Sequence, residues 1–140
     1  MNSKNENLDL DPNPHPEGEL AAQTIALPAD TNQDGEIPGG WLASQMDMAA
    51  HLASSKVARG KVATVAIDNI SFLAPISLGS VVACYTKILG VGRSSIRVST
   101  EAWISHVVKG EEWRKVAEGV FTFVAIDSNG RTRAIPKGNG

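Results

Sequence analysis

One segment of this chain of 140 residues constrains its fold more than any other. Residues 41–56 contain no proline, no glycine and no β-branched residue, the kinds of residue that interrupt or weaken helices. Apolar side chains recur there at helical spacing, at Leu42, Met46, Ala49, Ala50 and Ala53. The segment therefore predicts one long helix.

The rest of the chain is typical of β-structure. Four segments follow the helix, and each is separated from the next by a turn that contains glycine. We expect strands at residues 62–72, 80–89, 94–104 with an extension to 108, and 112–127, and a short strand at 23–27. One helix followed by long strands and short loops predicts an α+β fold, in which an antiparallel sheet wraps a long central helix.

The N-terminal segment differs in composition from the rest. Residues 1–20 contain five acidic residues, one lysine and few apolar residues, as a disordered acidic tail does. We therefore expect one domain at residues 21–136 and a flexible C-terminus at 137–140. A single helix covers a sheet face only in part, so the exposed apolar surface also predicts a homo-oligomer.

Charge and hydropathy exclude several classes of protein. Residues 21–140 carry ten acidic and twelve basic residues, too small an excess for a nucleic-acid-binding protein. No apolar run is long enough to span a membrane, and the N-terminus lacks the apolar stretch of a signal peptide. The single cysteine, Cys84, is interpreted as a buried strand residue. It cannot form an intramolecular disulfide, which predicts a cytoplasmic protein.

The loop before the helix resembles half of a calcium site. Asp30, Asn32 and Asp34 alternate as in an EF-hand, and Gly35 would supply the sharp turn. The twelfth position, which requires a glutamate, holds Trp41, and no helix is predicted upstream. These two departures exclude calcium, and no other metal site is expected.

Ser44, Asp47 and His51 share one face of the predicted helix and suggest a hydrolase triad. Ser44 and His51 are seven residues apart, about 10 Å along a helix axis, so they cannot form the hydrogen bond that a triad requires. Most acidic residues on helices face water, which is the simplest interpretation of Asp47. Its polar neighbours are small residues and a histidine rather than lysine or glutamate, so a cleft or a subunit contact is the second interpretation.

Pro38, Gly39 and Gly40 open the predicted helix. A helix start without a side-chain cap leaves backbone N–H groups unpaired at the positive end of the helix dipole. Such groups can bind a phosphate or polarise a carbonyl oxygen. A tight turn before a helix explains the same three residues equally well.

These segments also form one longer pattern. Residues 27–47 read LPADTNQDGEIPGGWLASQMD. This stretch closely resembles the signature of the YciA-type acyl-CoA thioesterases of the hotdog-fold superfamily. The resemblance continues through residues 62–65, 72–75, 79–82, 91–96, 101–103, 121–125 and 129–131, and it covers about residues 24–136.

The resemblance implies a hotdog fold and the hydrolysis of acyl-CoA thioesters to a free acid and coenzyme A (CoA), without a metal or organic cofactor. It places Asp47 at the position of the catalytic acid, Asn32 at that of its partner asparagine, and Gly39 and Gly40 at the oxyanion-binding helix start. It also implies a dimer of hotdog subunits and a hexamer built as a trimer of dimers. Whether Asp47 acts as general base or as nucleophile stays open.

Helix geometry adds a condition on the site. Gly40 and Asp47 are seven residues apart, about 10 Å along one helix, too far to act on one thioester group. We therefore expect composite active sites, in which one subunit contributes the N–H groups and its neighbour contributes Asp47. The CoA phosphates need cations at turns, for which we expect Arg93 with Ser94 and Ser95 first, and Arg59 and Lys61 second.

Two positions depart from the family pattern. Pro38 stands where a bulky residue is usual, and His51 stands where a small apolar residue is usual. Because proline fixes φ and has no N–H group, Pro38 is expected to stiffen the entry to the oxyanion site. His51 is expected at a subunit contact rather than paired with Asp47.

Two other functions compete with hydrolysis. A hotdog enoyl-CoA hydratase would carry a Gly-Asp-x-Asn-Pro-x-His stretch, but Asp47 and His51 are one residue too close for it and no Asn-Pro element is present. A non-catalytic acyl-CoA-binding domain would not require Asn32, Gly40 and Asp47 together. Thioester hydrolysis is therefore the function that the sequence favours.

Overall fold

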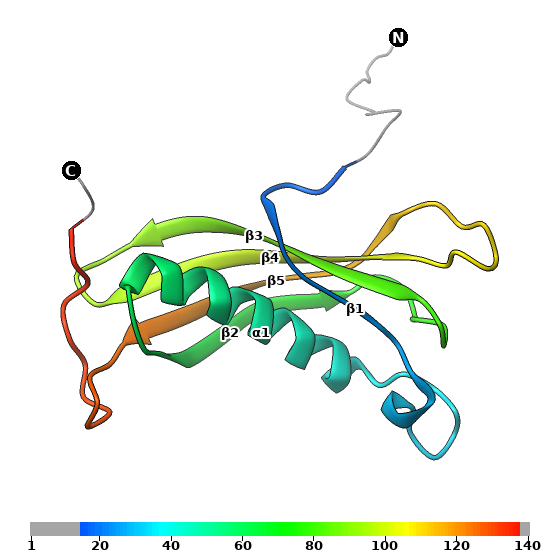
Figure 1. Ribbon diagram of the computed structural model, residues 1–140, viewed down its shortest axis with the longest axis horizontal. Coiled ribbons are helices and arrows are strands. Elements are labelled where there is room, and N and C mark those ends of the chain that lie inside the picture. Colours follow the sequence, from blue (N-terminus) through cyan, green and yellow to red (C-terminus); the bar gives the residue numbers. More distant parts are fainter. Residues whose placement is uncertain (1–14, 138–140) are drawn as a thin grey trace, which may run out of the picture.

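The computed structural model describes residues 15–137 and consists of one sheet and one long helix (Figure 1). Five strands form an antiparallel sheet in the order β1–β3–β4–β5–β2. The elements in chain order are β1 Glu19–Ile25, the 3-10 helix η1 Pro28–Asp30, α1 Gly39–Ala58, β2 Val62–Phe72, β3 Val81–Val91, β4 Ser95–Ser105 and β5 Arg114–Ala125. Helix α1 lies across one face of the sheet, as predicted. Neither helix in the described range has the length and apolar character needed to cross a membrane.

The four long strands follow the predictions except at one turn, whereas the short strand expected at residues 23–27 runs from Glu19 to Ile25. β2 has the predicted bounds, and β3, β4 and β5 begin and end within two residues of theirs. The expected extension of the third long strand to residue 108 is wrong, because Val108 is 92% exposed in the connection to β5. Gly110 donates its N–H to the Val107 carbonyl and has a φ of 68°, a conformation that favours glycine and turns the chain away from the sheet.

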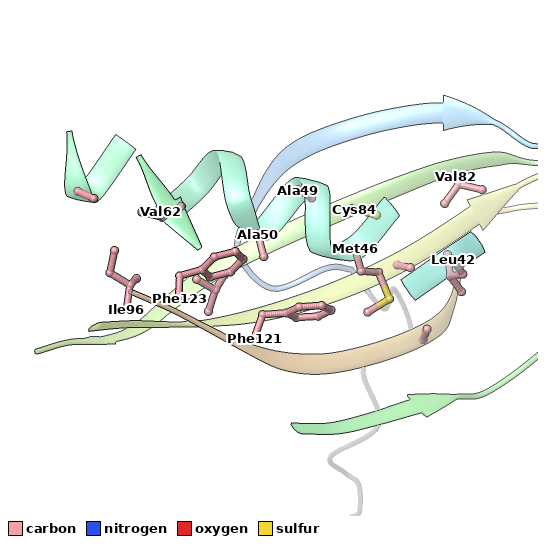
Figure 2. Packing of buried hydrophobic residues seen from close by; sticks show 14 of the residues in the cluster. Leu42, Met46, Ala49, Ala50, Val62, Val82, Cys84, Ile96, Phe121 and Phe123 are labelled. Carbon is pink, nitrogen blue, oxygen red and sulfur yellow. The ribbon is translucent and has the colours of Figure 1, made fainter. Parts of the chain in front are cut away.

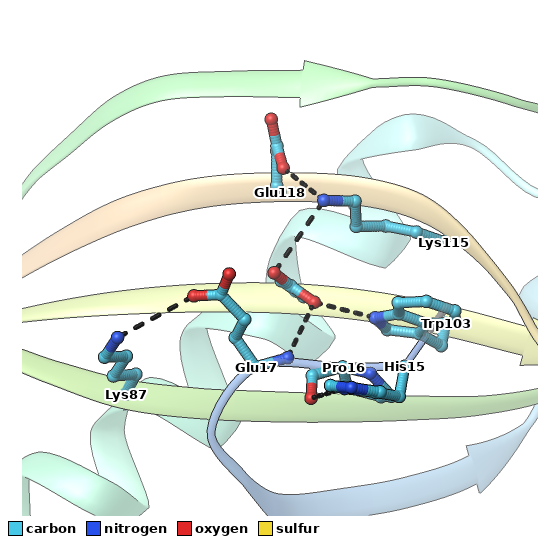
Figure 3. Close-up of polar contacts among 8 residues, drawn as sticks. His15, Pro16, Glu17, Lys87, Trp103, Lys115 and Glu118 are labelled. Carbon is cyan, nitrogen blue, oxygen red and sulfur yellow. Dashed lines mark hydrogen bonds and ion pairs between the residues drawn. The ribbon is translucent and has the colours of Figure 1, made fainter. Parts of the chain in front are cut away.

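The described domain starts earlier than predicted. β1 begins at Glu19, inside the segment expected as an acidic tail, and residues 1–14 lie outside the described residues. Gly18 has a φ of 97° and lies so close to β3 that a side-chain carbon there would be 2.2 Å from a backbone carbonyl oxygen. Glu17 pairs with Lys87 at 3.7 Å, and its N–H donates to Glu101 (Figure 3). Pairing with β3 and these contacts hold this segment against the sheet, although its composition alone suggests disorder.

Helix α1 is two residues longer at each end than predicted. It begins at Gly39, and Pro38 is its N-cap residue. At the other end Arg59 adopts the left-handed conformation with a φ of 53°. The Arg133 guanidinium donates to the Ala58 carbonyl at 3.0 Å, so the last turn is satisfied by the C-terminal segment.

Small side chains let the helix lie close to the sheet. The buried face of α1 consists of Leu42, Met46, Ala49, Ala50, Ser54 and Ala58. Ser54 is buried, whereas Ala53, which the apolar spacing had included in the buried face, is only half buried. Phe121 and Phe123 of β5 lie between the helix and the sheet and are completely buried (Figure 2). The two rings therefore pack against a helix face that includes three alanines, Ala49, Ala50 and Ala58.

Truncation of one of these rings tests the packing. Phe121→Ala is expected to lower the free energy of unfolding by about 3–5 kcal/mol, because it removes apolar contacts and leaves a cavity that a sheet cannot close. Urea denaturation followed by tryptophan fluorescence measures the change. Val108→Ala, at an exposed loop position, serves as the control and is expected to change stability by no more than about 0.5 kcal/mol.

Candidate active site

Asp47 lies on the side of α1 that faces strand β2. Thr64 Oγ1 donates a hydrogen bond of 2.8 Å to Asp47 Oδ1. Among the described residues no other hydrogen bond and no ion pair reaches this carboxylate, so Oδ2 has no partner within the described chain. The contact with β2 shows that Asp47 does more than face water.

Thr64 is a site residue that the sequence analysis missed. It follows Asp47 by 17 residues and lies on a different element, so no helical or strand spacing connects the two. Threonine is also common in strands, which makes it inconspicuous there. Only the packing of α1 against β2 identifies the pair.

The other two polar residues of the apparent triad take no part in this contact. The ring of His51 packs edge-on against Phe123, with ring centroids 5.8 Å apart and planes at 82°. Ser44 is exposed. His51 therefore belongs to the packing of the helix on the sheet rather than to a hydrogen-bonded chain with Asp47.

The start of α1 presents unpaired donors. Pro38 caps the helix without a side-chain hydrogen bond, and the first turn contains no acidic residue. The N–H groups of Trp41 and Leu42 both point to the Pro38 carbonyl, at 3.1 and 3.5 Å. Gly39 and Gly40 donate to no acceptor within the described part of the chain. Two N–H groups at the positive end of a helix of 20 residues are thus available to an anion or a polarised carbonyl.

No contact within the described chain requires a glycine at position 40. Its φ lies outside the range that favours glycine, and a side-chain carbon added there would meet no atom within 4 Å. At Gly39, by contrast, the added carbon would lie 3.4 Å from the ring of Phe72. The space beside Gly40 is therefore open to something that the single chain does not contain.

Asn32 organises the loop before the helix. Its Oδ1 accepts hydrogen bonds from the N–H groups of Asp34 and Glu36, at 2.9 and 3.0 Å. This arrangement assigns the oxygen to the loop and leaves the side-chain NH₂ group as the free end, so Asn32 can offer a donor to a ligand. Asp30 Oδ2 accepts the N–H of Leu27 at 2.9 Å in the same loop. No cluster of three or more potential metal ligands is present in residues 15–137.

The structure does not bring all these residues together in one chain. Asn32 and the glycines lie at the N-terminal end of α1, whereas Asp47 lies two turns further along, about 10 Å away along the axis. The five residues predicted for CoA lie at the opposite end of the helix (Figure 1). The residues predicted for the site therefore form three separate groups along one helix.

The five residues predicted for CoA do form a group. Arg59 caps the C-terminus of α1 and Lys61 precedes β2, where its carbonyl accepts the N–H of Ile126. Ser94 lies in the turn from β3 to β4 and accepts the N–H of Ala125, the neighbour of Ile126. Arg93 belongs to the same turn, and Ser95 is the first residue of β4. Backbone hydrogen bonds thus place all three predicted cations at one end of the molecule.

The C-terminal segment adds further cations to this end, which the sequence analysis did not include. The Ile135 N–H donates to the Arg93 carbonyl, which holds the segment against the turn. Arg131 is exposed, whereas the Arg133 guanidinium is occupied by the carbonyls of Ile126 and Ala58. Arg131 therefore joins the surface charge of this end, and Arg133 has a structural role.

Comparisons with known proteins show the family to which the chain belongs. A family model described as the thioesterase superfamily matches residues 35–110. An uncharacterised acyl-CoA thioester hydrolase of Haemophilus influenzae is 48% identical over 125 residues, which cover 87% of this chain and 80% of the relative. The acyl-CoA thioester hydrolase YciA of Escherichia coli is 40% identical over 124 residues, 86% of this chain and 93% of that protein. The chain belongs to the thioesterase superfamily.

A solved structure extends the similarity to three dimensions. A hexameric broad-specificity acyl-coenzyme A thioesterase superposes with a TM-score of 0.86 at 46% sequence identity, covering 90% of this chain and 86% of that one. The single helix against a five-stranded antiparallel sheet is the hotdog fold that the sequence predicted. The likeness to YciA-type enzymes is confirmed as well.

Cys84, the one cysteine of the chain, lies apart from the start of α1. Cys84 is buried in β3, and desolvation raises the pKa of its thiol to about 12. Since the thiolate is the reactive form, Cys84 is expected to resist a thiol reagent such as DTNB in the folded protein at pH 8. Unfolding in guanidinium should release one reactive thiol per chain, counted by absorbance. Rapid labelling without denaturant would contradict the buried placement.

Proposed function

We propose that this chain hydrolyses acyl-CoA thioesters to a free acid and CoA. The relatives and the solved structure described above are named acyl-CoA thioester hydrolases or thioesterases. Within the chain itself, one observation carries the proposal. Two unpaired N–H groups at Gly39 and Gly40 and a carboxylate with an open oxygen at Asp47 are the two groups that thioester hydrolysis needs.

A second copy of the chain completes the site. β2 is the last strand of the sheet, and its outer edge has no partner among the described residues. Val65 and Ile67 on this strand are 56% and 45% exposed. An unpaired edge with apolar side chains favours strand pairing with another chain. A two-fold axis at the strand centre, Ile67, then pairs Thr64 of one copy with Ile70 of the other.

This pairing joins the two halves of the site. Thr64 holds Asp47 near one end of β2, and the ring of Phe72, at the other end of β2, lies beside Gly39. Because the two copies of β2 run antiparallel, Asp47 of one copy approaches the helix start of the other. We propose two such composite sites per dimer. The similarity to hexameric thioesterases supports three dimers per assembly.

The chemistry follows from the two groups. The thioester carbonyl oxygen accepts hydrogen bonds from the N–H groups at Gly39 and Gly40, which stabilise the negative charge that develops on it. Asp47 either removes a proton from water, which attacks the carbonyl carbon, or attacks that carbon itself to form a mixed anhydride that water then cleaves. In both routes the C–S bond breaks and CoA leaves as a thiol after it gains a proton. Thr64 orients the carboxylate, and the NH₂ group of Asn32 orients water or the carbonyl.

The charged part of the substrate needs a separate surface. Arg59, Lys61 and Arg93 lie near the C-terminus of α1, and Arg59 is 12 residues from Asp47, about 18 Å along the axis. CoA is an extended molecule whose phosphates lie far from its thiol. We propose that these cations, with Ser94 and Ser95, bind its phosphates on the subunit that supplies Asp47. Water is the only other reactant, and the proposed mechanism assigns its activation to Asp47 without a metal or organic cofactor. A single buried cysteine suits the cytoplasm.

Replacement of the carboxylate tests the chemistry. Asp47→Asn is expected to lower kcat about 100- to 10,000-fold, the usual contribution of a positioned acid or base, with acyl-CoA hydrolysis measured as thiol release. Thr64→Val removes one hydrogen bond to a charged group and is expected to lower kcat about tenfold, whereas Thr64→Ser should retain most of the activity. Glu112→Gln, the same loss of charge in the exposed β4–β5 connection, is the control. Full activity of Asp47→Asn would overturn the catalytic role of Asp47, whereas no thiol release by either the wild type or the variant would favour the non-catalytic binding domain.

Complementation between two inactive variants tests the composite site. Gly40→Asp fits the open space beside Gly40 and suits a helix N-terminus, so the chain should fold, but its carboxylate opposes the negative charge of the reaction. Asp47→Asn subunits keep a normal helix start. After unfolding and refolding of an equal mixture, half of the dimers are mixed, and each mixed dimer has one intact site out of two. Recovery of about a quarter of wild-type activity is therefore expected.

Refolding each variant alone provides the control for complementation, and neither should recover activity. If the glycines and Asp47 of one chain served the same substrate, the mixture would also stay inactive. Size-exclusion chromatography of the mixture verifies that mixed assemblies form.

A further inference from the structure

Strand β2 contains one residue whose backbone conformation does not belong to a regular strand. Asn69 has a φ of 54°, in the left-handed region. Among the described residues only one other non-glycine residue has a positive φ, Arg59, which ends α1. No helix end or turn explains Asn69, because β2 continues on both sides of it. A left-handed residue inside a strand is typical of a β-bulge.

The pairing of β2 with β5 locates the bulge. Asp68 pairs with Val120, and Ser71 pairs with Glu118. The chain thus advances three residues along β2, from 68 to 71, while it covers two along β5, from 120 to 118. Asn69 lies in this interval, so the left-handed residue and the extra residue of the bulge coincide.

A second irregularity lies nearer the start of β2. Thr64 pairs with Phe123 and Ala66 pairs with Thr122, so β2 has one extra residue there as well. Each extra residue exchanges the two faces of the strand from that point onward. The first bulge therefore turns the middle of β2 over, and the bulge at Asn69 turns it back.

The restored alternation lets both ends of β2 face the helix. Thr64 donates to Asp47 on α1, and the ring of Phe72 lies beside Gly39 at the helix start. If the bulge at Asn69 were lost while the first bulge remained, Phe72 would point to the opposite side of the sheet. One left-handed residue thus decides which side of the sheet Phe72 occupies.

The neighbouring strand leaves room for this bulge. A carbon added at Gly119 of β5 would lie 3.2 Å from both Cα and Cβ of Ile70, a tighter approach than side-chain carbons usually make. Ile70 follows Asn69 directly and packs, partly buried, against the core. The close approach of the bulged backbone therefore explains the glycine at position 119.

We infer that the bulge at Asn69 is a positioning element of the proposed active site. It keeps Phe72 against the start of α1, while Thr64 at the other end of the same strand holds Asp47. The inference rests on the proposed function and adds Asn69 and Gly119, which act on the N–H donors through Phe72 and do not touch the substrate. Asparagine suits this place because, after glycine, it tolerates the left-handed conformation best.

Two substitutions at Asn69 separate its backbone conformation from its side chain. Asn69→Val places a β-branched residue at a left-handed position, so the strand is expected to straighten and to turn Phe72 away from Gly39. The kcat of thiol release from acyl-CoA should fall about 100-fold, an effect that a misplacement of about 1 Å can have. Asn69→Gly removes the same side chain but favours the left-handed conformation, so it should keep the wild-type kcat.

Urea denaturation of both variants refers each kcat to folded protein, because a purely structural role would lower stability and leave the kcat of the folded fraction unchanged. Full activity of folded Asn69→Val would overturn the inference. A loss in Asn69→Gly equal to that in Asn69→Val would also overturn it, since the side chain rather than the bulge would then be responsible.

Gly119 allows the same bulge to be disturbed from β5. Gly119→Ala places a carbon against Ile70 and is expected to displace the bulge and lower kcat. Because both substitutions act on one feature, the double variant of Asn69→Val and Gly119→Ala should lose no more activity than about the larger single loss. Losses that multiply in the double variant would indicate two unrelated defects and contradict the inference.

Mixed refolding tests which half of the site depends on the bulge. The bulge acts on the donors of its own chain, which in the proposed dimer serve Asp47 of the partner. An equal mixture of Asn69→Val and Asp47→Asn chains should therefore recover about a quarter of wild-type activity. If the Gly40→Asp mixture recovers activity and the Asn69→Val mixture does not, the inference alone is overturned. If the wild type itself releases no thiol, the proposed function fails instead.

Discussion

The packing of one helix against one face of one sheet is the constraint on which the rest of this structure depends. Ala49 and Ala50 allow α1 to approach the rings of Phe121 and Phe123, and no other long helix in the described chain shares this role. The helix direction is thereby fixed relative to every strand. Each functional group on α1 is then held at a set height above the sheet, which is the precision that positioned catalytic groups need.

The groups proposed for the reaction lie at three positions along α1. Donors lie at its N-terminus, the carboxylate of Asp47 lies two turns further, and the cations lie beyond its C-terminus. A rigid helix cannot bring these three groups together, because a rise of about 1.5 Å per residue keeps them apart. In the proposed mechanism, one chain therefore holds every group that the reaction needs but not one complete site. In the proposed dimer, an antiparallel second copy brings the N–H donors of one helix to the carboxylate of the other.

Strand β2 connects this chemistry with assembly. It contributes Thr64 to the carboxylate, Phe72 to the wall beside the glycines, and an unpaired edge with exposed apolar side chains. One strand thus orients the carboxylate of Asp47, borders the helix start that carries the proposed donors, and offers the edge through which a second copy can pair. A change on β2 is consequently expected to affect activity and association together.

The sequence by itself determined the helix, the number and approximate bounds of the long strands, the family, and the separation of Gly40 from Asp47. These features depend on local periodicity, on helix-breaking residues or on the fixed rise of a helix, and all of them are properties of neighbouring residues. Only the tertiary structure decided that Thr64 holds Asp47, that His51 packs on Phe123, and that the ring of Phe72 lies beside Gly39. It also decided that Glu19 and Leu20 belong to β1, because pairing with β3 outweighs their composition. Each of these contacts joins residues far apart in the chain, and no local pattern encodes which surfaces meet when the helix packs on the sheet.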